Sequence, residues 1–523
     1  MNKKLLLLST FAVGAACLAS CGQNHDPYAD LDFSVDIKGA SISMWTPFGA
    51  EMHAIVEELV KEWAEKTGVT VEIEAKSGYD TLKSAVSESA SSKTYPNITF
   101  AYPDHMASYV GQDIILRLDK YFEMGGNTKF DYASDAPTFK ISDFYTDYMR
   151  ENQSVEFKED GSGYTLGVPF NKSTEVLTYN KTFFDWAAGQ DPEIVVPSTW
   201  TEVDTVGVKI LNLLEDKGIY GKFLGTDNLV YDSHDACVAA TGTDELFDFS
   251  NVVNPKTADA SNRTRAFHPV GRDSMSNFFI TSVRQYGGEY TTVDKATRKG
   301  KILFDSPQTL TALTDLQTRY NNNIFGIPGT WGESKYCSNP FSTLKCVMTV
   351  GSSAGADSNA PAGGKFSVSC APIFYKDADK KFVISQGTNL ILTDKGTNAD
   401  RVASWELLKY LTKYVNGKFA ADSGYFPACD YAFQSKEYQD FFNYKPVSMT
   451  DQINLAAAKV NRDFYSKESE NWVKFVDAAF DGSSTVRTRV DTAVGLVTIG
   501  LNGKQQEPRK VIDDMVKDLA DYK

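Results

Sequence analysis

Long apolar segments are nearly absent from this chain of 523 residues. Its one apolar run, residues 5–18, is shorter than the about 20 residues that a membrane-spanning helix needs. No later segment approaches that length. The sequence therefore predicts no transmembrane helix, and its hydrophobic content of 42% serves instead to build the cores of two or three domains.

Positive charge is also in deficit. The chain has 53 Lys and Arg residues against 68 Asp and Glu residues, which gives a formal net charge of −15. Proteins that bind nucleic acid or anionic lipid surfaces through charge present clusters of Lys and Arg. The acidic balance therefore argues against nucleic acid as a partner and against charge-driven binding to membranes.

Cysteine is scarce, with seven residues at positions 17, 21, 237, 337, 346, 370 and 429. No CxxC pair occurs, so we expect neither a structural zinc site nor a disulfide framework. Setting Cys17 and Cys21 aside leaves five cysteines, an odd number, so at least one is free or bonded to another chain. Cys337 and Cys346 are near enough in sequence to form a bridge, but we favour buried free thiols.

Histidine is scarce too, and this bears on catalysis. Residues 351–355 match the G-x-S-x-G pattern, in which Ser353 would be the nucleophile of an α/β-hydrolase, followed along the chain by an acid and then a histidine. All five histidines, at positions 25, 53, 105, 234 and 268, precede Ser353. That order of residues is therefore impossible here. The HExxH zinc motif is also missing, and we predict no catalytic residue, no cofactor and no enzyme activity.

Acidic residues gather at Asp227, Asp232 and Asp235. They lack the spacing and the closing glutamate of an EF-hand calcium loop. The pattern predicts a solvated acidic loop and no metal site.

The N-terminus combines Lys3 and Lys4, the apolar run and the tetrad formed by residues 18–21, Leu-Ala-Ser-Cys. This arrangement resembles the signal peptide and lipobox of bacterial lipoproteins. The resemblance implies cleavage after residue 20, a diacylglycerol on Cys21, and a protein anchored by lipid at the extracellular face of the cell membrane. Residues 21–39 then read as a lipidated tether. The alternative is an ordinary secretory peptide with a chance cysteine, and Cys17 fits the tetrad less well.

Strand and helix patterns alternate at the start of the folded region. Residues 40–45, 69–75 and 97–102 read as strands, and apolar residues at helical spacing over 52–63 and a second segment at 80–91 read as helices. This order predicts a parallel α/β sheet. Ligands of such sheets bind beyond the carboxyl ends of the strands, where Trp45, Tyr79 and Asp104 follow.

Three blocks further along carry a family resemblance. Residues 169–181 read PFNKSTEVLTYNK, residues 197–202 read PSTWTE and residues 424–428 read GYFPA. Together with Trp45, residues 76–79 and residues 351–355, they resemble the extracellular solute-binding proteins of bacterial ABC importers, of the maltose-binding and sn-glycerol-3-phosphate-binding type. The resemblance covers about residues 42–517.

The resemblance implies an α/β fold of two lobes, the type II periplasmic-binding-protein-like fold, with a ligand cleft between the lobes. It divides the chain into residues 40–170 plus 366–418 for lobe 1 and residues 171–365 plus 419–523 for lobe 2. The implied partners are a small solute and the permease subunits of an ABC importer, the implied state is a monomer, and the implied membrane contact is through the lipid alone. The alternative is a surface-anchored carbohydrate-active hydrolase or an adhesin.

The same resemblance supplies candidate ligand contacts from both lobes. Aromatic rings stack on the CH faces of sugars, while carboxylates and amides bind hydroxyls. For Trp45 and Tyr79 the alternative is core packing, and for Asp104 it is a helix N-cap. The candidates are Trp45, Tyr79, Asp104, Asn171, Ser173, Tyr231, Trp331, Gly387 and Tyr425.

One departure from the family bears on the ligand. Phe480 stands where the glycerol-3-phosphate-binding proteins place an arginine that helps to hold phosphate, and Arg487 matches another position. A phosphate site needs a bidentate cation or several backbone donors. We therefore expect a neutral sugar or oligosaccharide, with glycerol-3-phosphate or a glycerophosphodiester as the alternative ligand.

Overall fold

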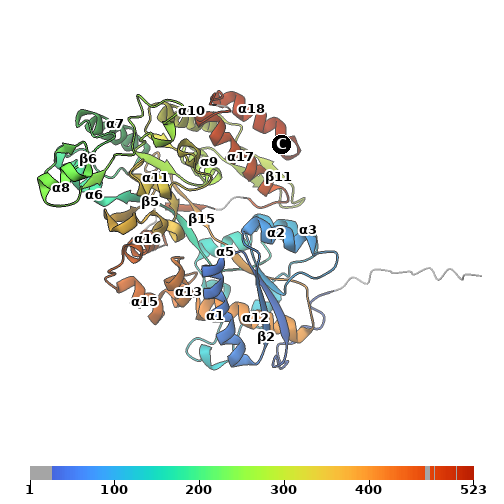
Figure 1. Ribbon diagram of the computed structural model, residues 1–523. Coiled ribbons are helices and arrows are strands. Elements are labelled where there is room, and N and C mark those ends of the chain that lie inside the picture. The colour runs from blue at the N-terminus through green and yellow to red at the C-terminus, as the bar shows by residue number, and fades with distance from the viewer. Residues whose placement is uncertain (1–25, 466–471, 476–477, 502) are drawn as a thin grey trace, which may run out of the picture.

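The computed structural model describes residues 26–465, 472–475, 478–501 and 503–523, which form two lobes, each built on its own β-sheet (Figure 1). The proposed signal peptide and Cys21 lie outside the described residues. Within the described part of the chain, no helix is both long and apolar enough to cross a membrane.

The first lobe is built on a five-stranded sheet in the order β2-β1-β3-β16-β4. The pairs β1–β2 and β1–β3 are parallel, which confirms the predicted parallel arrangement, whereas β16 runs antiparallel to β3 and β4. The strands are β1 (Ser41–Thr46), β2 (Thr70–Ala75), β3 (Ile98–Ala101), β4 (Val168–Pro169) and β16 (Asn389–Leu392). The helices that follow the first three strands are α1 (Ala50–Thr67), α2 (Tyr79–Glu88) and α3 (Pro103–Gly111).

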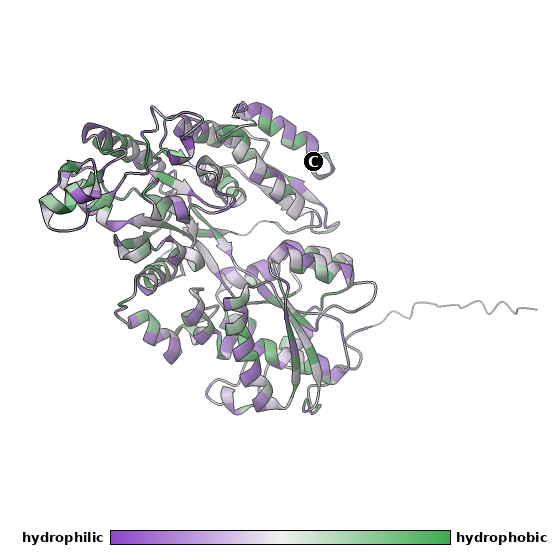
Figure 2. Ribbon diagram, in the orientation of Figure 1, coloured by the Kyte–Doolittle hydropathy of each residue, from purple (hydrophilic) through white to green (hydrophobic). Residues whose placement is uncertain are grey.

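Helix α1 forms as its pattern predicts. Its inner face buries Val56, Leu59, Val60 and Trp63, which recur at helical spacing. Gly68 ends the helix at φ 74°, the left-handed conformation that glycine adopts without strain. In Figure 2 hydrophobic residues concentrate in the strands of this lobe, whereas a surface helix such as α15 (Lys436–Asn443) is mostly hydrophilic.

The second lobe is built on a larger sheet in the order β12-β9-β13-β5-β15-β17, with β14 beside β5. Thr199 begins α7 with a capping box, its hydroxyl accepting from the Glu202 amide. The strands are β5 (Ser173–Asn180), β9 (Val270–Arg272), β12 (Phe325–Gly326), β13 (Met348–Ser352), β14 (Val368–Ala371), β15 (Lys381–Gln386) and β17 (Trp472–Phe475). Its long helices are α7 (Trp200–Asp216), α9 (Met275–Gln285), α10 (Pro307–Asn321), α16 (Met449–Tyr465), α17 (Ser483–Thr498) and α18 (Pro508–Asp518).

Shorter elements complete both lobes. The remaining α-helices are α4 (Asp119–Met124), α5 (Thr146–Asn152), α6 (Lys181–Gln190), α8 (His234–Thr241), α11 (Ser338–Ser342), α12 (Asn398–Lys409), α13 (Asn416–Ser423) and α14 (Asp430–Phe433). Two small sheets comprise β6 (Phe223–Leu224), β7 (Val230–Tyr231) and β8 (Phe247–Asp248), and β10 (Thr291–Val293) with β11 (Gly300–Ile302).

The lobe boundaries differ in part from those expected. The first crossing agrees, because β4 belongs to the first sheet and β5 to the second. The expected return to the first lobe at residue 366 is corrected: β14 and β15 both hydrogen-bond to β5 of the second sheet, so the chain returns only at β16. The expected switch at residue 419 also comes too early, because Ala428, Cys429 and Ala432 lie in the first lobe's apolar core.

The segment expected to be a free tether is docked from residue 26 onward. Leu31 and Ile37 are each 7% exposed and pack into the first lobe's core. The Asn398 side chain exchanges hydrogen bonds with the backbone of Asp32, and the Tyr28 hydroxyl accepts from the Arg117 amide. Residues 21–25 of the expected tether lie outside the described residues.

The five described cysteines are free thiols. Cys237, Cys337, Cys346 and Cys429 are buried, and Cys370 is half-buried. This confirms the preference for buried thiols over a bridge between Cys337 and Cys346.

Candidate functional site

A cavity of about 910 Å³ lies between the lobes and takes its lining from both. The first lobe contributes residues at the starts of α2 and α3, directly after strands β2 and β3. The second lobe contributes the start of α9, one face of α17 along its length, and residues 327–329 and 333–336. The site thus lies beyond the carboxyl ends of the first lobe's parallel strands, where α/β sheets bind ligands.

Tyr79 is the centre of a polar network on the first-lobe side. The Asn171 amide donates to its hydroxyl over 3.0 Å, and the Tyr425 hydroxyl lies 3.4 Å away. Asn171 in turn accepts from the Thr388 hydroxyl over 2.6 Å. The ring of Tyr102 lies 5.0 Å from the ring of Tyr79, centroid to centroid. Burial, foremost, raises the pKa of Tyr79, so this hydroxyl stays a neutral donor and acceptor.

Asp104 joins the two lobes across the cavity. Its carboxylate accepts from the Ser484 hydroxyl of α17 over 2.5 Å, and Lys83 donates to the same hydroxyl over 3.0 Å. Burial alone would raise the pKa of Asp104, but His105, Arg487 and these hydrogen-bonding neighbours outweigh burial and hold that pKa below its ordinary value. The group is therefore an ionised acceptor at neutral pH.

The second-lobe side is polar around Arg487, which lines the cavity. Its guanidinium donates to Asn277, and the neighbouring Asp491 accepts from the Ser276 amide over 2.9 Å. Arg487 and Ser484 come from α17, near the end of the chain. The first-lobe parts of the site gave sequence signals, but α17 offered none beyond its charges.

A buried ion pair lies where the chain crosses between the lobes, and its carboxylate, Glu151, belongs to the cavity lining. Lys172, fully buried, donates to the carboxylate of Glu151 and, over 2.9 Å, to the Gly387 carbonyl oxygen. The Asn389 amide adds a hydrogen bond of 2.8 Å to Glu151. Burial raises the pKa of Glu151 and lowers that of Lys172. Both groups have their partners in place, which a buried charge requires.

The structure brings five of the nine candidate contacts together. Tyr79, Asp104 and Gly387 line the cavity. Asn171 and Tyr425 lie behind them, on the hydroxyl of Tyr79. These five therefore lie in or beside the cavity, and their contact with a ligand stays a prediction.

Two further candidates lie close to the crossing or to the strands without lining the cavity. Trp45 is half-buried, and the Lys76 ammonium lies 3.9 Å above its ring. Ser173 is 3% exposed and accepts from the Ser352 hydroxyl over 3.4 Å.

The remaining two lie elsewhere in the second lobe. The placement of Trp331 at the cleft is corrected: it is 4% exposed, and its indole N–H donates to the Ala266 carbonyl oxygen over 2.9 Å, so it packs in the lobe's core. Tyr231 belongs to β7 of the small sheet, and its hydroxyl donates to Asp227 over 2.5 Å.

Ser353 of the G-x-S-x-G stretch has a packing role. It is fully buried, and its hydroxyl oxygen accepts from the Asn461 amide over 2.9 Å and from the Thr174 amide over 3.2 Å. A nucleophile must reach its substrate, and this buried hydroxyl does not.

The candidate site is therefore the polar cavity between the two lobes.

Comparisons with known proteins agree with this geometry. No curated protein sequence matches the chain. Solved structures that share its fold include the following three. UgpB from Mycobacterium tuberculosis, in complex with glycerophosphocholine, is 15% identical with a TM-score of 0.63, over 92% of this chain and 98% of that one. The GacH receptor of Streptomyces glaucescens, in the unliganded form and in complex with acarbose, is 16% identical with a TM-score of 0.59, over 93% and 100%.

The third is the ABC substrate-binding protein Lmo0181 from Listeria monocytogenes, in complex with cycloalternan. It is 14% identical with a TM-score of 0.61, over 92% of this chain and 100% of that one. The model of the bacterial extracellular solute-binding protein family matches residues 58–445. That span covers most of both lobes and the crossings between them, and the chain therefore belongs to the bacterial extracellular solute-binding proteins.

Proposed function

We propose that this protein captures a neutral sugar or oligosaccharide between its lobes and delivers it to the permease of an ABC importer. The cavity of about 910 Å³ carries the proposal, since small-molecule sites span about 300–1,000 Å³. Tyr79 and Tyr102 line it and offer rings to the CH faces of a sugar. Carboxylate, amide and hydroxyl groups beside them match sugar hydroxyls.

Capture by closure of the lobes follows because the residues that line the cavity are divided between the two lobes. Tyr79 and Asp104 belong to one lobe, and Asn277 and Arg487 belong to the other. A ligand that contacts both sets binds the closed state more tightly than the open one, and only such a difference in affinity shifts the equilibrium. The complexes of GacH with acarbose and of Lmo0181 with cycloalternan support a carbohydrate.

A glycerophosphodiester is the second candidate, and Arg487 favours it. The guanidinium lines the cavity and has the planar donor geometry that holds phosphate. UgpB binds glycerophosphocholine. Against this stands Phe480, 2% exposed, at the position where the family's phosphate-binding arginine is expected.

Isothermal titration with maltose, maltotriose, cyclic glucans and glycerophosphocholine tests both candidates. We expect binding of a carbohydrate without its hydrolysis, and Tyr79→Ala to weaken that binding at least tenfold, about 1.4 kcal/mol. Tyr231→Ala, in the small sheet, is the matched control and should bind as the parent does. Arg487→Gln separates the ligands, since it should abolish binding of the phosphodiester and leave more of the sugar affinity. Turnover of a sugar, or no binding by any compound, contradicts the proposal.

We also propose that residues 1–20 are removed and that lipid on Cys21 anchors a monomer at the extracellular face of the cell membrane. Residues 21–25 span at most about 18 Å when extended, so the docked first lobe stays close to the bilayer and to its permease. Intact-mass measurement of the membrane fraction tests the modification. Cys21→Ala should release the protein, abolish the lipid mass and leave solute binding unchanged. A lipid mass that persists in the variant contradicts the proposal.

A further inference from the structure

Residues 223–255 form an acidic outgrowth of the second lobe, away from the cleft. It comprises the small sheet β7-β6-β8 and helix α8, at the left edge of Figure 1. The segment has no Lys or Arg and contains six acidic residues, Asp227, Asp232, Asp235, Asp244, Glu245 and Asp248. Charge of one sign at this density raises the local concentration of cations.

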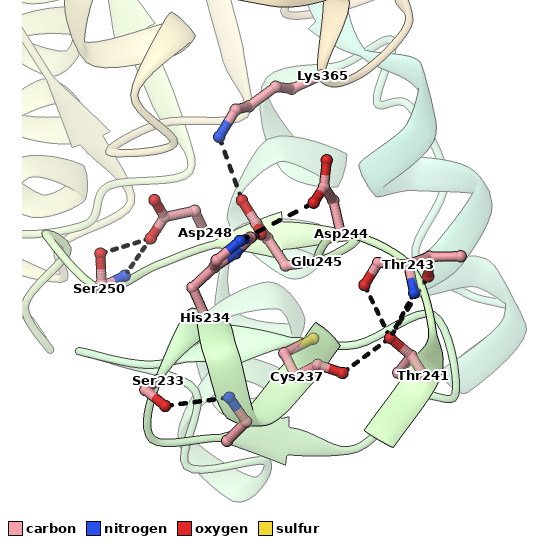
Figure 3. Close-up of polar contacts among 11 residues, drawn as sticks. Ser233, His234, Cys237, Thr241, Thr243, Asp244, Glu245, Asp248, Ser250 and Lys365 are labelled. Carbon is pink, nitrogen blue, oxygen red and sulfur yellow. Dashed lines mark hydrogen bonds and ion pairs between the residues drawn. The ribbon is translucent and has the colours of Figure 1, made fainter. Parts of the chain in front are cut away.

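Two carboxylates of the outgrowth lie beside one imidazole (Figure 3). His234 is the first residue of α8, and its Nδ1 lies 2.7 Å from a carboxylate oxygen of Glu245. Its Nε2 lies 3.9 Å from a carboxylate oxygen of Asp244. One ligand atom from each of the three residues falls within 4.8 Å of the others. The spacing of Asp227, Asp232 and Asp235 predicts a solvated acidic loop without a metal, and it gives no indication of this cluster of His234, Asp244 and Glu245.

The three side chains differ in how exposed they are, so one is held in place and the other two can move to bind a metal. The Glu245 side chain is 6% exposed and so fixed in place, whereas that of His234 is 48% exposed and that of Asp244 is 88% exposed. A tetrahedral zinc ion with bonds of about 2.0–2.1 Å sets its ligand atoms roughly 3.3 Å apart. The exposed Asp244 side chain is the ligand with most freedom to adjust to that spacing.

A lysine also pairs with the carboxylate of Glu245 and would compete with a metal for it. The Lys365 ammonium lies 3.2 Å from the second carboxylate oxygen of Glu245, and its side chain is 64% exposed. Figure 3 shows it reaching Glu245 from outside the outgrowth. An exposed lysine contributes little to such a pair and is readily displaced into solvent.

We propose that His234, Asp244 and Glu245 bind one divalent transition-metal ion of the Zn²⁺ class, which displaces Lys365. Imidazole with two carboxylates is a donor set that zinc accepts, whereas calcium takes oxygen ligands alone. The ion would tie the N-terminus of α8 to the turn before β8. It would stabilise the outgrowth without reaching the solute cleft.

Titration of the tag-free, chelator-treated full chain with Zn²⁺ against a fluorescent zinc chelator tests this. We expect one Zn²⁺ per chain, a rise in the thermal midpoint on its addition, and no comparable effect of Ca²⁺. His234→Ala and Asp244→Ala should each weaken Zn²⁺ binding at least about tenfold, since even supporting partners of a ligand are worth about 10–100-fold. Lys365→Met should strengthen it, because the competing cation is gone.

Asp232→Ala is the matched control, as an exposed acid of the same outgrowth that pairs with Lys222 over 3.0 Å. Its Zn²⁺ affinity should equal that of the parent. Equal binding by His234→Ala and the parent would overturn the proposal, as would Ca²⁺ binding as tight as that of Zn²⁺, because either result shows attraction by acidic charge alone. All the altered side chains are largely exposed, and circular dichroism verifies that each variant is folded.

Discussion

Lys172→Met tests what holds the crossing between the lobes together. The Lys172 ammonium, fully buried, neutralises Glu151, which is 2% exposed, and also donates to the Gly387 carbonyl oxygen. Methionine keeps most of the length of the side chain and removes its charge. The substitution leaves the carboxylate of Glu151 buried with hydrogen bonds but without a counter-ion.

The expected loss of stability is about 3–5 kcal/mol, the usual result of removing one partner of a buried ion pair. The loss also depends on pH. Burial raises the pKa of Glu151, and the loss of the cation raises it further. Between the ordinary pKa of glutamate and this raised value, the folded state holds a proton that the unfolded state lacks, so stability falls as pH rises through that window. We expect a larger deficit at pH 8 than at pH 5.

Urea unfolding followed by tryptophan fluorescence at both pH values measures this. Lys181→Met is the matched control, because Lys181 pairs with Asp185 on a helix surface with both side chains at least half exposed, and it should cost no more than about 0.5 kcal/mol. Lys172→Met combined with Glu151→Leu should recover most of the loss. A Lys172→Met deficit equal to that of the control, or equal at both pH values, would refute the reasoning.

Two smaller changes test local geometry by the same urea assay. Gly387 has φ 91°, and a Cβ there would lie 1.8 Å from the Asn171 carbonyl oxygen. Gly387→Ala should therefore lower the free energy of unfolding by clearly more than the about 1–2 kcal/mol of a left-handed alanine. Gly363→Ala is the control, because Gly363 has φ 69° with open space around it, and it should lower stability by that strain alone. Thr199→Ala removes the N-cap of α7 and should cost about 1 kcal/mol, whereas Thr201→Ala, exposed in the same turn, should change stability little.

The sequence predicted those parts of the fold that local pattern determines. Alternating strands and helices over residues 40–102 gave the parallel core of the first lobe, and Gly68 marked the end of α1. It did not predict which sheet a later strand joins. β14 has the pattern of a strand in either lobe, and only its pairing with β5 assigns it to the second. Such pairing depends on distant residues, which short-range periodicity does not record.

The site divides in the same way. Tyr79 and Asp104 follow strands directly, so topology placed them at the ligand edge. Ser484 and Arg487 reach the cavity from a helix almost 400 residues further along the chain, by tertiary packing alone. Trp331, in a glycine-flanked segment typical of an exposed loop, is covered by the core instead. The residue types at a turn predict its local conformation. They do not predict which distant parts of the chain cover the turn.

The contacts between the lobes indicate how little energy closure involves. Each lobe has its own large apolar cluster, while α2 and α3 meet the second lobe through hydrogen bonds. Ser484 bonds to Asp104 and Lys83, and Ser108 donates to Asp481 over 3.4 Å. Exchange of a hydrogen bond with water changes the free energy by about 0.5–1.5 kcal/mol, so these three are worth a few kcal/mol together.

A solute bound with micromolar affinity has about −8 kcal/mol of binding free energy. A shift from about 1% to 99% closed needs only about 5.5 kcal/mol of preference for one state. The two large apolar clusters stay within the lobes, and the aromatic packing that joins the lobes, such as Tyr148 on Tyr465, lies apart from the contacts of α2 and α3. Contacts to Tyr79 on one side and Arg487 on the other therefore suffice to decide between the states. The polar character of the contacts that α2 and α3 make with the second lobe is what makes the two lobes responsive to a small ligand.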